Sequence, residues 1–413
     1  MDKKRTKKTS VGGFFEIILL SIFLILVALV TYQPAQAAEK VITIYAMGDY
    51  SGPYGGLTTP GLVAHRDVMK HWQKNNLIPG AKYDLKWADS GGVLARATSI
   101  FRRFKESKPK PLLIVIAQTG EAEALRPLFE ESKMVLYSWG ASAKVTYPVG
   151  KYVFGNMVSY PDQFGFFVDY VSKNWDYTKM KRNPKVGILT WDTAFGRGFE
   201  SNVTMAYAVQ KKVDIIKPFQ FAPTAPIDVS TQILTLNKDG ADWIYSSWMA
   251  AQTATVCKDL ARLGLKDKVK YAGSCPTGDV FLKRLAGDDA EGFLTTHSYR
   301  TFDEDPNAVW MKLFRENNRK PDDMAYGYPQ MVCGTMTILE AYKRAIHKVG
   351  WDALSSDALA EALESLKDFD GWTAPVAYGP SRHSHNKVRF VQWKQGKLLP
   401  VTDWTEAPNM NPK

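Results

Sequence analysis

The stretch Ala46 to Gly56, AMGDYSGPYGG, has the glycine content of a phosphate-binding turn. It directly follows an apolar run, and small residues at such a point let backbone N–H groups approach an anion at a helix N-terminus. The glycines are not spaced as G-x-G-x-x-G, no Gly-Lys-Ser/Thr follows, and Pro53 removes one backbone donor. The stretch is therefore predicted to form the rim of a cleft for a different kind of ligand.

Patterns for catalysis and metal binding are weak. Ser107 and Lys110 match S-x-x-K, but they lie in a proline-broken segment without the S-D-N or K-T-G companions. No G-x-S-x-G or His-Glu-x-x-His is present. His383 and His385 have no nearby Asp, Glu or Cys to complete a metal site. We expect no enzymatic activity, no catalytic residues, no metal and no cofactor.

Two series of alternating strands and helices would position the functional residues. Apolar runs predict strands at 41–47, 83–88, 112–117 and 134–137 in the first series, and at 185–190, 213–221, 243–246 and 269–272 in the second. Segments with helical spacing lie between them. Such alternation predicts parallel sheets covered on both faces, and hence an α/β protein with two Rossmann-like lobes.

The loops that follow these strands are rich in hydroxyls, glycines and aromatic residues. Open α/β sheets bind ligands beyond the carboxyl ends of their strands, so function is expected there. The loops in question are 48–56, 118–121, 139–142, 191–196, 246–248 and 273–276.

Four motifs in order resemble the type I periplasmic binding proteins. They are Tyr50-Ser51-Gly52-Pro53, Trp139-Gly140-Ala141-Ser142, Asp192 with Phe195-Gly196-Arg197-Gly198, and Ala286 to Phe293 (AGDDAEGF). The most similar branch is the leucine/isoleucine/valine-binding group, whose members deliver amino acids, amides or urea to ATP-binding-cassette importers. The resemblance covers roughly residues 40 to 400.

The resemblance implies two lobes joined by a hinge that the chain crosses three times. Lobe 1 would comprise residues 40–158 plus 300–376, and lobe 2 residues 159–298 plus 377–405. The crossings would fall near 158–161, 297–300 and 375–379, with the ligand cleft between the lobes. Closure of the hinge would trap a small molecule for a membrane permease. A sensor that signals to a membrane partner is the main alternative, and an exported enzyme is the less favoured one.

The resemblance also implies the site. Ser142 and the backbone of Gly140 would hold a carboxylate or amide, and Gln118, Thr119 and Gly120 would lie at the matching loop before the next helix. Aromatic side chains would form the walls. The complete set of predicted ligand-binding residues is Tyr50, Tyr54, Gln118, Thr119, Gly120, Trp139, Gly140, Ser142, Asp192, Phe195, Trp248 and Cys275.

Cys275 bears on the identity of the ligand. Amino-acid binders of this family place an acidic side chain after the fifth strand of the second lobe, and the matching stretch here is 273–276. A buried ammonium without a partner is strongly disfavoured. Unless Asp192 or Glu121 supplies the charge, leucine, isoleucine and valine should bind weakly. A carboxylate or amide without a free α-amine, with an aromatic or branched body, should bind better.

The N-terminus predicts export. Five Lys and Arg residues precede the apolar run 14–30, and Ala35-Gln36-Ala37 is typical of a signal-peptidase site. Residues 1–37 are therefore expected to be a cleavable signal peptide, which would give a periplasmic or extracytoplasmic protein; an uncleaved membrane anchor is the alternative. Removing this segment lowers the formal net charge of +11 to +8, because five basic and two acidic side chains are lost.

The remaining basic residues are scattered along the chain, so no nucleic-acid partner is expected, and the protein is predicted to be a monomer. Three cysteines allow at most one internal disulfide. Whether Cys257 pairs with Cys275 stays open.

Overall fold

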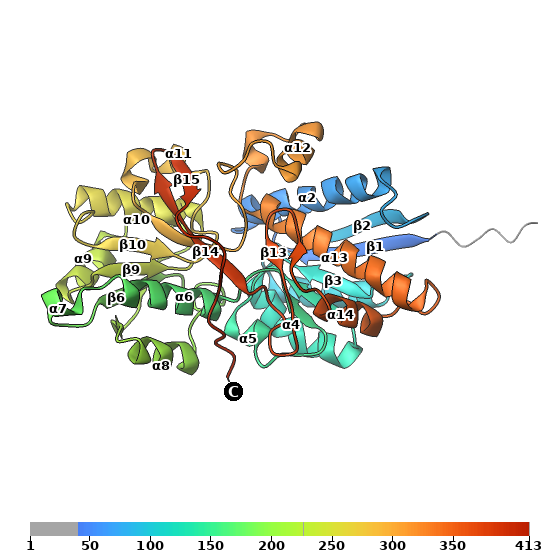
Figure 1. The fold of residues 1–413 in the computed structure, drawn as a ribbon, viewed down its shortest axis with the longest axis horizontal. Coiled ribbons are helices and arrows are strands. Elements are labelled where there is room, and N and C mark those ends of the chain that lie inside the picture. The colour runs from blue at the N-terminus through green and yellow to red at the C-terminus, as the bar shows by residue number, and fades with distance from the viewer. Residues whose placement is uncertain (1–39, 226, 413) are drawn as a thin grey trace, which may run out of the picture. The chain divides into compact units, whose positions relative to one another are not determined.

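The computed structural model describes residues 40–225 and 227–412. The predicted signal peptide, 1–37, lies outside the described residues. Residues 41–413 form one compact unit built on two sheets, each covered by helices (Figure 1). The predicted α/β fold with two lobes and parallel sheets is confirmed.

The first sheet consists of five parallel strands in the order β2-β1-β3-β4-β5. The strands β3 and β4 are fully buried, as expected for a sheet covered on both faces. The strands are β1 (Val41–Gly48), β2 (Lys82–Asp89), β3 (Leu113–Ile116), β4 (Val135–Ser138) and β5 (Val153–Gly155).

Helices from two distant parts of the chain cover this sheet. The longest, α13, comes from the C-terminal third of the chain and packs along α2 (Figure 1). Together these elements form lobe 1. Its helices are α2 (Gly55–Lys74), α3 (Leu94–Lys105), α4 (Thr119–Ser132), α5 (Ala143–Thr146), α12 (Val309–Glu316), η2 (Pro321–Asp323), α13 (Gly327–Val349) and α14 (Ser356–Glu364), with a small hairpin of β12 (Phe369–Asp370) and β13 (Pro375–Val376).

The second sheet is mixed and forms lobe 2. Its main path runs β15-β14-β11-β10-β9-β6-β7, and β14 and β15 are antiparallel additions from the C-terminal end of the chain. The strands are β6 (Lys185–Thr190), β7 (Asp214–Ile215), β8 (Gln220–Phe221), β9 (Trp243–Ser246), β10 (Lys270–Gly273), β11 (Leu294–His297), β14 (Lys387–Lys394), β15 (Lys397–Pro400) and β16 (Thr405–Glu406). Its helices are α6 (Tyr160–Lys173), α7 (Tyr177–Met180), α8 (Asn202–Gln210), α9 (Ser230–Lys238), α10 (Ala250–Arg262), α11 (Leu282–Leu285) and η1 (Gly287–Ala290).

One predicted strand differs in the structure. The run 213–221 forms two short strands, β7 and β8, which pair with different parts of β6. Pro218 lies between them and has no N–H to donate to a ladder, so a continuous strand is interrupted there.

The chain passes between the two sheets three times: after β5, after β11, and between β13 and β14. Two of the connecting segments run side by side, because Val158 forms a parallel bridge with His385. The backbone N–H of His385 donates to Met157 O at 3.0 Å, and Val158 N–H donates to Ser298 Oγ of the remaining segment at 3.3 Å. These segments form the hinge. The lobe boundaries given above, at single-residue detail, stay a prediction.

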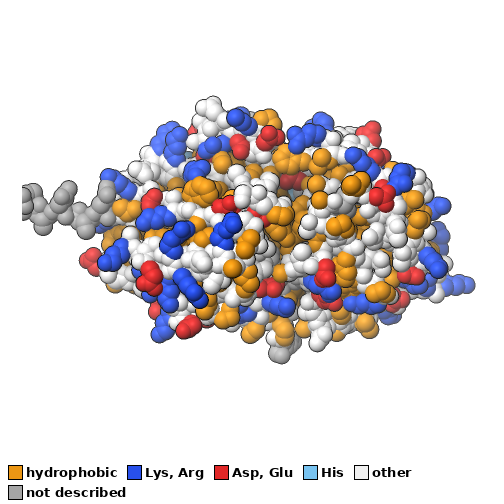
Figure 2. All heavy atoms as spheres, turned by 180° about the vertical axis from the view of Figure 1, so that it is seen from behind, with side chains coloured by type: hydrophobic (Ala, Val, Ile, Leu, Met, Phe, Trp, Pro, Cys, Tyr) orange, Lys and Arg blue, Asp and Glu red, His pale blue; other side chains and the backbone are white. Residues whose placement is uncertain are grey.

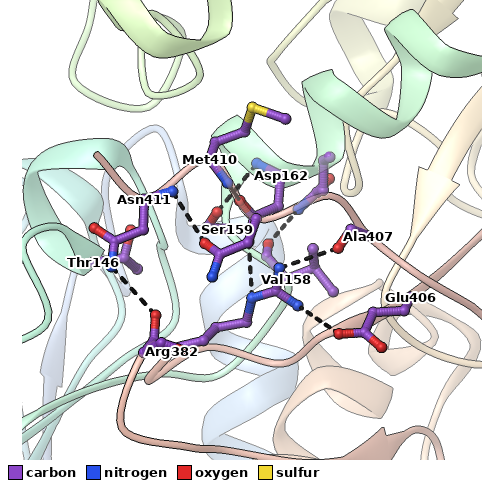
Figure 3. A network of polar contacts seen from close by, with 12 residues as sticks. Thr146, Val158, Ser159, Asp162, Arg382, Glu406, Ala407, Met410 and Asn411 are labelled. Atoms are coloured by element: carbon purple, nitrogen blue, oxygen red, sulfur yellow. Dashed lines mark hydrogen bonds and ion pairs between the residues drawn. The ribbon is translucent and has the colours of Figure 1, made fainter. Parts of the chain in front are cut away.

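The C-terminal segment is hydrogen-bonded to the segments of this hinge (Figure 3). Met410 N–H donates to Asp162 Oδ1 at 2.8 Å, and Arg382 Nη2 donates to Ala407 O at 3.1 Å. Arg382 Nε also lies 3.5 Å from Asp162 Oδ2, and both side chains are buried. Asp162 therefore joins the first crossing, the third crossing and the C-terminal segment.

The cysteines and the apolar helices bear on two further features of the chain. Cys257, Cys275 and Cys333 are all buried and unpaired, so no disulfide links Cys257 to Cys275. Among residues 40–225 and 227–412, no helix has both the length and the apolar character needed to cross a membrane.

Candidate ligand cleft

The carboxyl ends of the strands in the two sheets face one another across the cleft. The loops after β1, β3 and β4 meet the loops after β6 and β10. The lobes touch on both sides of the cleft: Ala143 N–H donates to Gly198 O at 3.0 Å, and Tyr326 N–H donates to Asp279 Oδ2 at 2.6 Å. The described conformation is therefore one in which the lobes are in direct contact.

Aromatic side chains connect the lobes across the cleft. The ring of Tyr54 lies edge-on to Trp191 and to Phe195, with centroid separations of 5.9 Å and 6.3 Å. Tyr160, in the first turn of α6, lies 5.3 Å from Phe195. Edge-to-face pairs of this kind contribute roughly 0.5–1.5 kcal/mol beyond the area that they bury.

A small central cavity lies between these rings. Its volume is about 20 Å³, enough for a single water molecule. Among the described residues, no charged side chain lines it, and the polar side chains of its lining are hydroxyls, amides and the indole of Trp139. The lining residues are Tyr54, Leu57, Ala117, Gln118, Thr119, Trp139, Gly140, Met157, Tyr160, Phe195, Pro276 and Gln330.

The polar end of the cavity is built by the loops after β3 and β4. Gln118 caps α4, because its side chain accepts a hydrogen bond from Glu121 N–H at 2.6 Å. A Cβ on Gly140 would lie only 2.1 Å from Thr119 Oγ1, so the close approach of the two loops requires glycine. Gln330 Nε2 donates to Trp139 O at 3.2 Å and holds this loop from α13. Gln118 and Thr119, at the N-terminus of α4, line the cavity, so the positive end of this helix dipole lies beside it.

Six of the predicted site residues line the central cavity: Tyr54, Gln118, Thr119, Trp139, Gly140 and Phe195. Gly120 lies beside them and also faces lobe 2, because a Cβ there would approach Ala194 Cβ at 3.6 Å. These residues are brought together as the motifs predict. Their role in binding stays a prediction.

Ser142 and Asp192 lie farther out, along a cavity of about 710 Å³ on one side of the cleft. The hydroxyl of Ser142 donates to Glu123 Oε1 at 2.6 Å and accepts from Val145 N–H at 3.3 Å, so it caps the short helix α5. Asp192 forms an ion pair with Arg197 at 2.5 Å. Both polar groups are engaged within the protein in this conformation.

The other three predicted site residues point elsewhere. Tyr50 packs edge-on against Trp87 at 5.6 Å. Trp248 is buried in the core of lobe 2, where its indole N–H donates to Tyr271 Oη at 3.0 Å. Cys275 is fully buried, and its Sγ lies 3.8 Å from Met157 Sδ. Tyr50, Trp248 and Cys275 therefore do not line the central cavity.

Two buried carboxyl groups lie close to the cleft. Burial raises the pKa of Glu121 to about 7, although Ser90 donates a hydrogen bond to it. Burial likewise raises the pKa of Asp279 to about 6, although the backbone N–H groups of Tyr326 and Phe281 donate hydrogen bonds to the carboxylate and lower its pKa. Neither residue lines the central cavity. In the part of the chain that the structure describes, no acidic side chain therefore lines the central cavity, where it could pair with an α-ammonium group.

Several residues of the cleft had no signal in the sequence. Gln330 lies in α13 and Met157 in the crossing segment after β5, and neither segment carries a recognisable motif. Tyr160 begins α6 and has the sequence context of an ordinary helix start. Leu57 lies in the first turn of α2 and Pro276 in the loop after β10, and neither apolar residue has a pattern that marks it as part of a site. Only the fold brings these residues to one place.

No three His, Cys, Asp or Glu side chains in the described ranges gather as a metal site requires. Lys and Arg side chains are spread over the face drawn in Figure 2 and do not form a single stripe. This distribution matches a solvated basic surface.

The comparisons with known proteins agree with this geometry. A family profile described as periplasmic binding protein matches residues 41–397. The chain belongs to this family. The predicted relationship to the type I periplasmic binding proteins is thus confirmed. A search of curated protein sequences gave no significant match for this periplasmic binding protein.

Solved structures with the same fold have low sequence identity to the chain. A branched chain amino acid ABC transporter protein from Thermus thermophilus with bound valine has a TM-score of 0.80 and 21% identity, covering 90% of this chain and 98% of that one. A fatty acid ABC transporter substrate-binding protein from Thermomonospora curvata has a TM-score of 0.74 and 17% identity, covering 90% and 94%. A solute-binding protein of an R. palustris ABC transporter in complex with 4-hydroxybenzoate has a TM-score of 0.70 and 18% identity, covering 90% and 98%.

Proposed function

We propose that the protein is the extracytoplasmic solute-binding component of an ATP-binding-cassette importer. It captures a small organic ligand by hinge closure and performs no chemistry on it. The observation that carries this proposal is the cleft itself: the carboxyl ends of two sheets face each other, and the residues lining the cavity come from both lobes. A ligand that contacts both sides stabilises the closed form, which a membrane permease would recognise.

The head group of the ligand is proposed to be a carboxylate or an amide. The relatives with named ligands bind valine, a fatty acid or 4-hydroxybenzoate, which share a carboxyl group. In this chain the first turn of α4 and the loop at Gly140 would receive it, with Thr119 beside them. Ser142 would contribute through its backbone, since its hydroxyl caps α5.

The absence of an acidic residue from the central cavity supports a ligand without a free α-amine. Removing one partner of a buried ion pair costs about 3–5 kcal/mol, and a buried ammonium group without an acidic partner carries a cost of this size. At about 1.4 kcal/mol per tenfold, leucine should bind at least a hundredfold more weakly than a deaminated analogue such as 4-methylpentanoate.

Calorimetric titration of the purified mature chain with leucine, 4-methylpentanoate, benzoate and short amides tests this proposal. We expect Tyr54→Ala to weaken binding at least tenfold, because it removes an aromatic wall that reaches both lobes. Tyr177→Ala is the matched control, since that tyrosine lies on α7, outside the cleft. Tight binding of leucine with none of 4-methylpentanoate would contradict the proposed ligand class.

The sensor alternative uses the same closure, so binding data do not separate the two roles. Uptake of the ligand by a strain that lacks the gene does: loss of uptake supports the importer, and unchanged uptake with a lost response to the ligand supports the sensor. The cleavable signal peptide and the monomeric state are part of the proposal. Mass spectrometry and sedimentation of the exported protein would check them.

A further inference from the structure

A second cavity adjoins the central one along the cleft. It has a volume of about 210 Å³ and shares Leu57 and Pro276 with the central cavity. This volume is about ten times that of the central cavity. We call it the side cavity. Its lining residues come from both lobes: Pro53, Gly56, Leu57, Trp191, Met249, Ala250, Ala251, Gln252, Pro276, Asp279, Phe281, Arg284, Leu285 and Ala325.

Most of these side chains are apolar, but two of the lining residues carry a polar atom that has no hydrogen-bond partner in the described chain. They are the indole Nε1 of Trp191 and the amide Oε1 of Gln252, and both atoms are buried. The Trp191 side chain is 2% exposed. Buried polar atoms of native proteins are nearly always hydrogen-bonded, so an unsatisfied donor and an unsatisfied acceptor on two residues of one cavity lining indicate a missing partner.

The orientation of Gln252 is fixed by its other amide atom. Its Nε2 donates to Thr224 O at 2.7 Å, which leaves Oε1 as the unused acceptor. The indole N–H of Trp191 can only donate. A single group that satisfies both must accept one hydrogen bond and donate another. Hydroxyls and primary amides have this property, whereas carboxylates, ethers and alkyl groups lack it.

The charged residues of the side cavity are already engaged. The carboxylate of Asp279 accepts hydrogen bonds from Tyr326 N–H at 2.6 Å and from Phe281 N–H at 3.2 Å. Arg284 lies over the ring of Phe281 and faces Asp322 at 3.6 Å, where 70% of its side chain is exposed. It therefore lies at the rim. The interior offers an apolar space with one donor and one acceptor.

We propose that the side cavity is the specificity subsite of the cleft, which holds the apolar body of the ligand and recognises a hydroxyl or primary amide at its far end through Trp191 and Gln252. The proposal rests on the proposed function, since the head group of the same ligand occupies the central cavity. The ligand is thus an elongated carboxylate or amide with an aryl or branched alkyl body and a polar terminus. A short carboxylate occupies the head-group end of the cleft and leaves the side cavity empty.

Gly56 offers a way to block the side cavity without disturbing the fold. It lines the cavity in the first turn of α2, and a Cβ added there meets no atom within 4 Å. Gly56→Leu should therefore project into the open space. Gly56→Ala is the matched control, because it also replaces the glycine by a residue with a Cβ but adds little volume to the cavity. Thermal unfolding of each variant checks that it is folded.

The probes are isobutyrate, 3-phenylpropanoate and 3-(4-hydroxyphenyl)propanoate, measured by calorimetric titration. We expect the wild type to bind the hydroxylated aryl acid about tenfold more tightly than the plain one, and both more tightly than isobutyrate. Gly56→Leu should weaken the two aryl acids at least tenfold and leave isobutyrate within twofold. Gln252→Leu should abolish the preference for the hydroxyl while leaving 3-phenylpropanoate within about threefold.

The outcomes separate the subsite from the function. If all three acids bind with similar affinity, and neither Gly56→Leu nor Gln252→Leu changes it, the subsite is wrong and the proposed function stands. If aryl binding falls in Gly56→Leu but the preference for the hydroxyl is absent in the wild type, the polar recognition is wrong. If none of the acids binds while leucine does, the proposed ligand class and the subsite both fail.

Discussion

The buried pair of Arg382 and Asp162 predicts a pH-dependent loss of stability when the arginine is replaced. The two side chains are 9% and 0% exposed, and Nε lies 3.5 Å from Oδ2 without hydrogen-bond geometry (Figure 3). In Arg382→Met the carboxylate loses its buried cation but keeps hydrogen bonds from Tyr147 Oη and Met410 N–H, both at 2.8 Å. Breaking a buried pair costs about 3–5 kcal/mol, and the retained bonds favour the lower end, ~3 kcal/mol.

The sign of the pH dependence follows from the pKa of Asp162. Burial raises this pKa above its usual value of 3.8, and Arg382 opposes the rise. Removal of the arginine therefore raises the folded-state pKa further. A carboxyl whose pKa is higher in the folded than in the unfolded state makes the free energy of unfolding fall as pH rises between the two values. The deficit of Arg382→Met should be largest near pH 7.5 and should shrink towards pH 4, by about 1.4 kcal/mol for each unit of additional pKa shift.

Urea unfolding at several pH values measures this deficit. The double variant Arg382→Met/Asp162→Asn should recover much of the stability at pH 7.5, because no buried charge remains. Arg182→Met is the control: its partner Asp242 lies in a more exposed pair, with side chains 41% and 17% exposed, and its loss should cost less than about 1 kcal/mol. A deficit that is the same at pH 4 and pH 7.5 would refute the reasoning, since lost packing of the arginine stem would then explain it.

Two further predictions concern Glu121 and Gly61. Burial raises the pKa of Glu121 from 4.5 to about 7, so its ionisation should lower the stability of the wild type as pH rises through this window. Urea unfolding of Glu121→Gln should show a change in the free energy of unfolding between pH 5 and pH 8 that is smaller than in the wild type by up to ~3 kcal/mol. An equal change in the two proteins would show that Glu121 does not cause the pH dependence. A Cβ on Gly61 would lie 2.0 Å from Trp139 Cη2. Gly61→Ala should therefore destabilise the protein by ~1–3 kcal/mol despite better helix propensity and weaken ligand binding, whereas retained stability and affinity would show that Trp139 moves freely.

The strands that the sequence predicts well are those with unbroken apolar runs. The predicted ranges 185–190 and 243–246 coincide with β6 and β9, because strands buried on both faces leave no polar gap. The three-residue strand β5 is too short to produce a pattern. In β14 the inner and outer positions alternate only partly, and its antiparallel position beside β11 depends on the third crossing. Non-local pairing of this kind cannot be read from local periodicity.

The candidate site was predictable where loops carry several unusual residues together. Tyr54, Trp139 and Phe195 lie in such loops and do meet in the cleft. Trp248 also follows a strand, but its indole lies in the core of lobe 2, where its N–H donates a hydrogen bond to Tyr271 Oη. The direction of a large side chain at a strand end is decided by its tertiary partners, and the sequence gives no measure of them.

The contact between the lobes affects how a ligand must bind. The ring of Tyr54 contacts those of Trp191 and Phe195, and the central cavity has a volume of only about 20 Å³. A head group larger than one water molecule therefore has to separate these rings, and the ligand must replace the contacts that it breaks. Because a ligand shifts the hinge only by its differential affinity for the two states, the ring contacts lower the affinity of any molecule that fills the central cavity alone. A body in the side cavity would add contacts to both lobes without displacing a ring, so the proposed selectivity for elongated ligands follows from the same aromatic contacts that join the lobes.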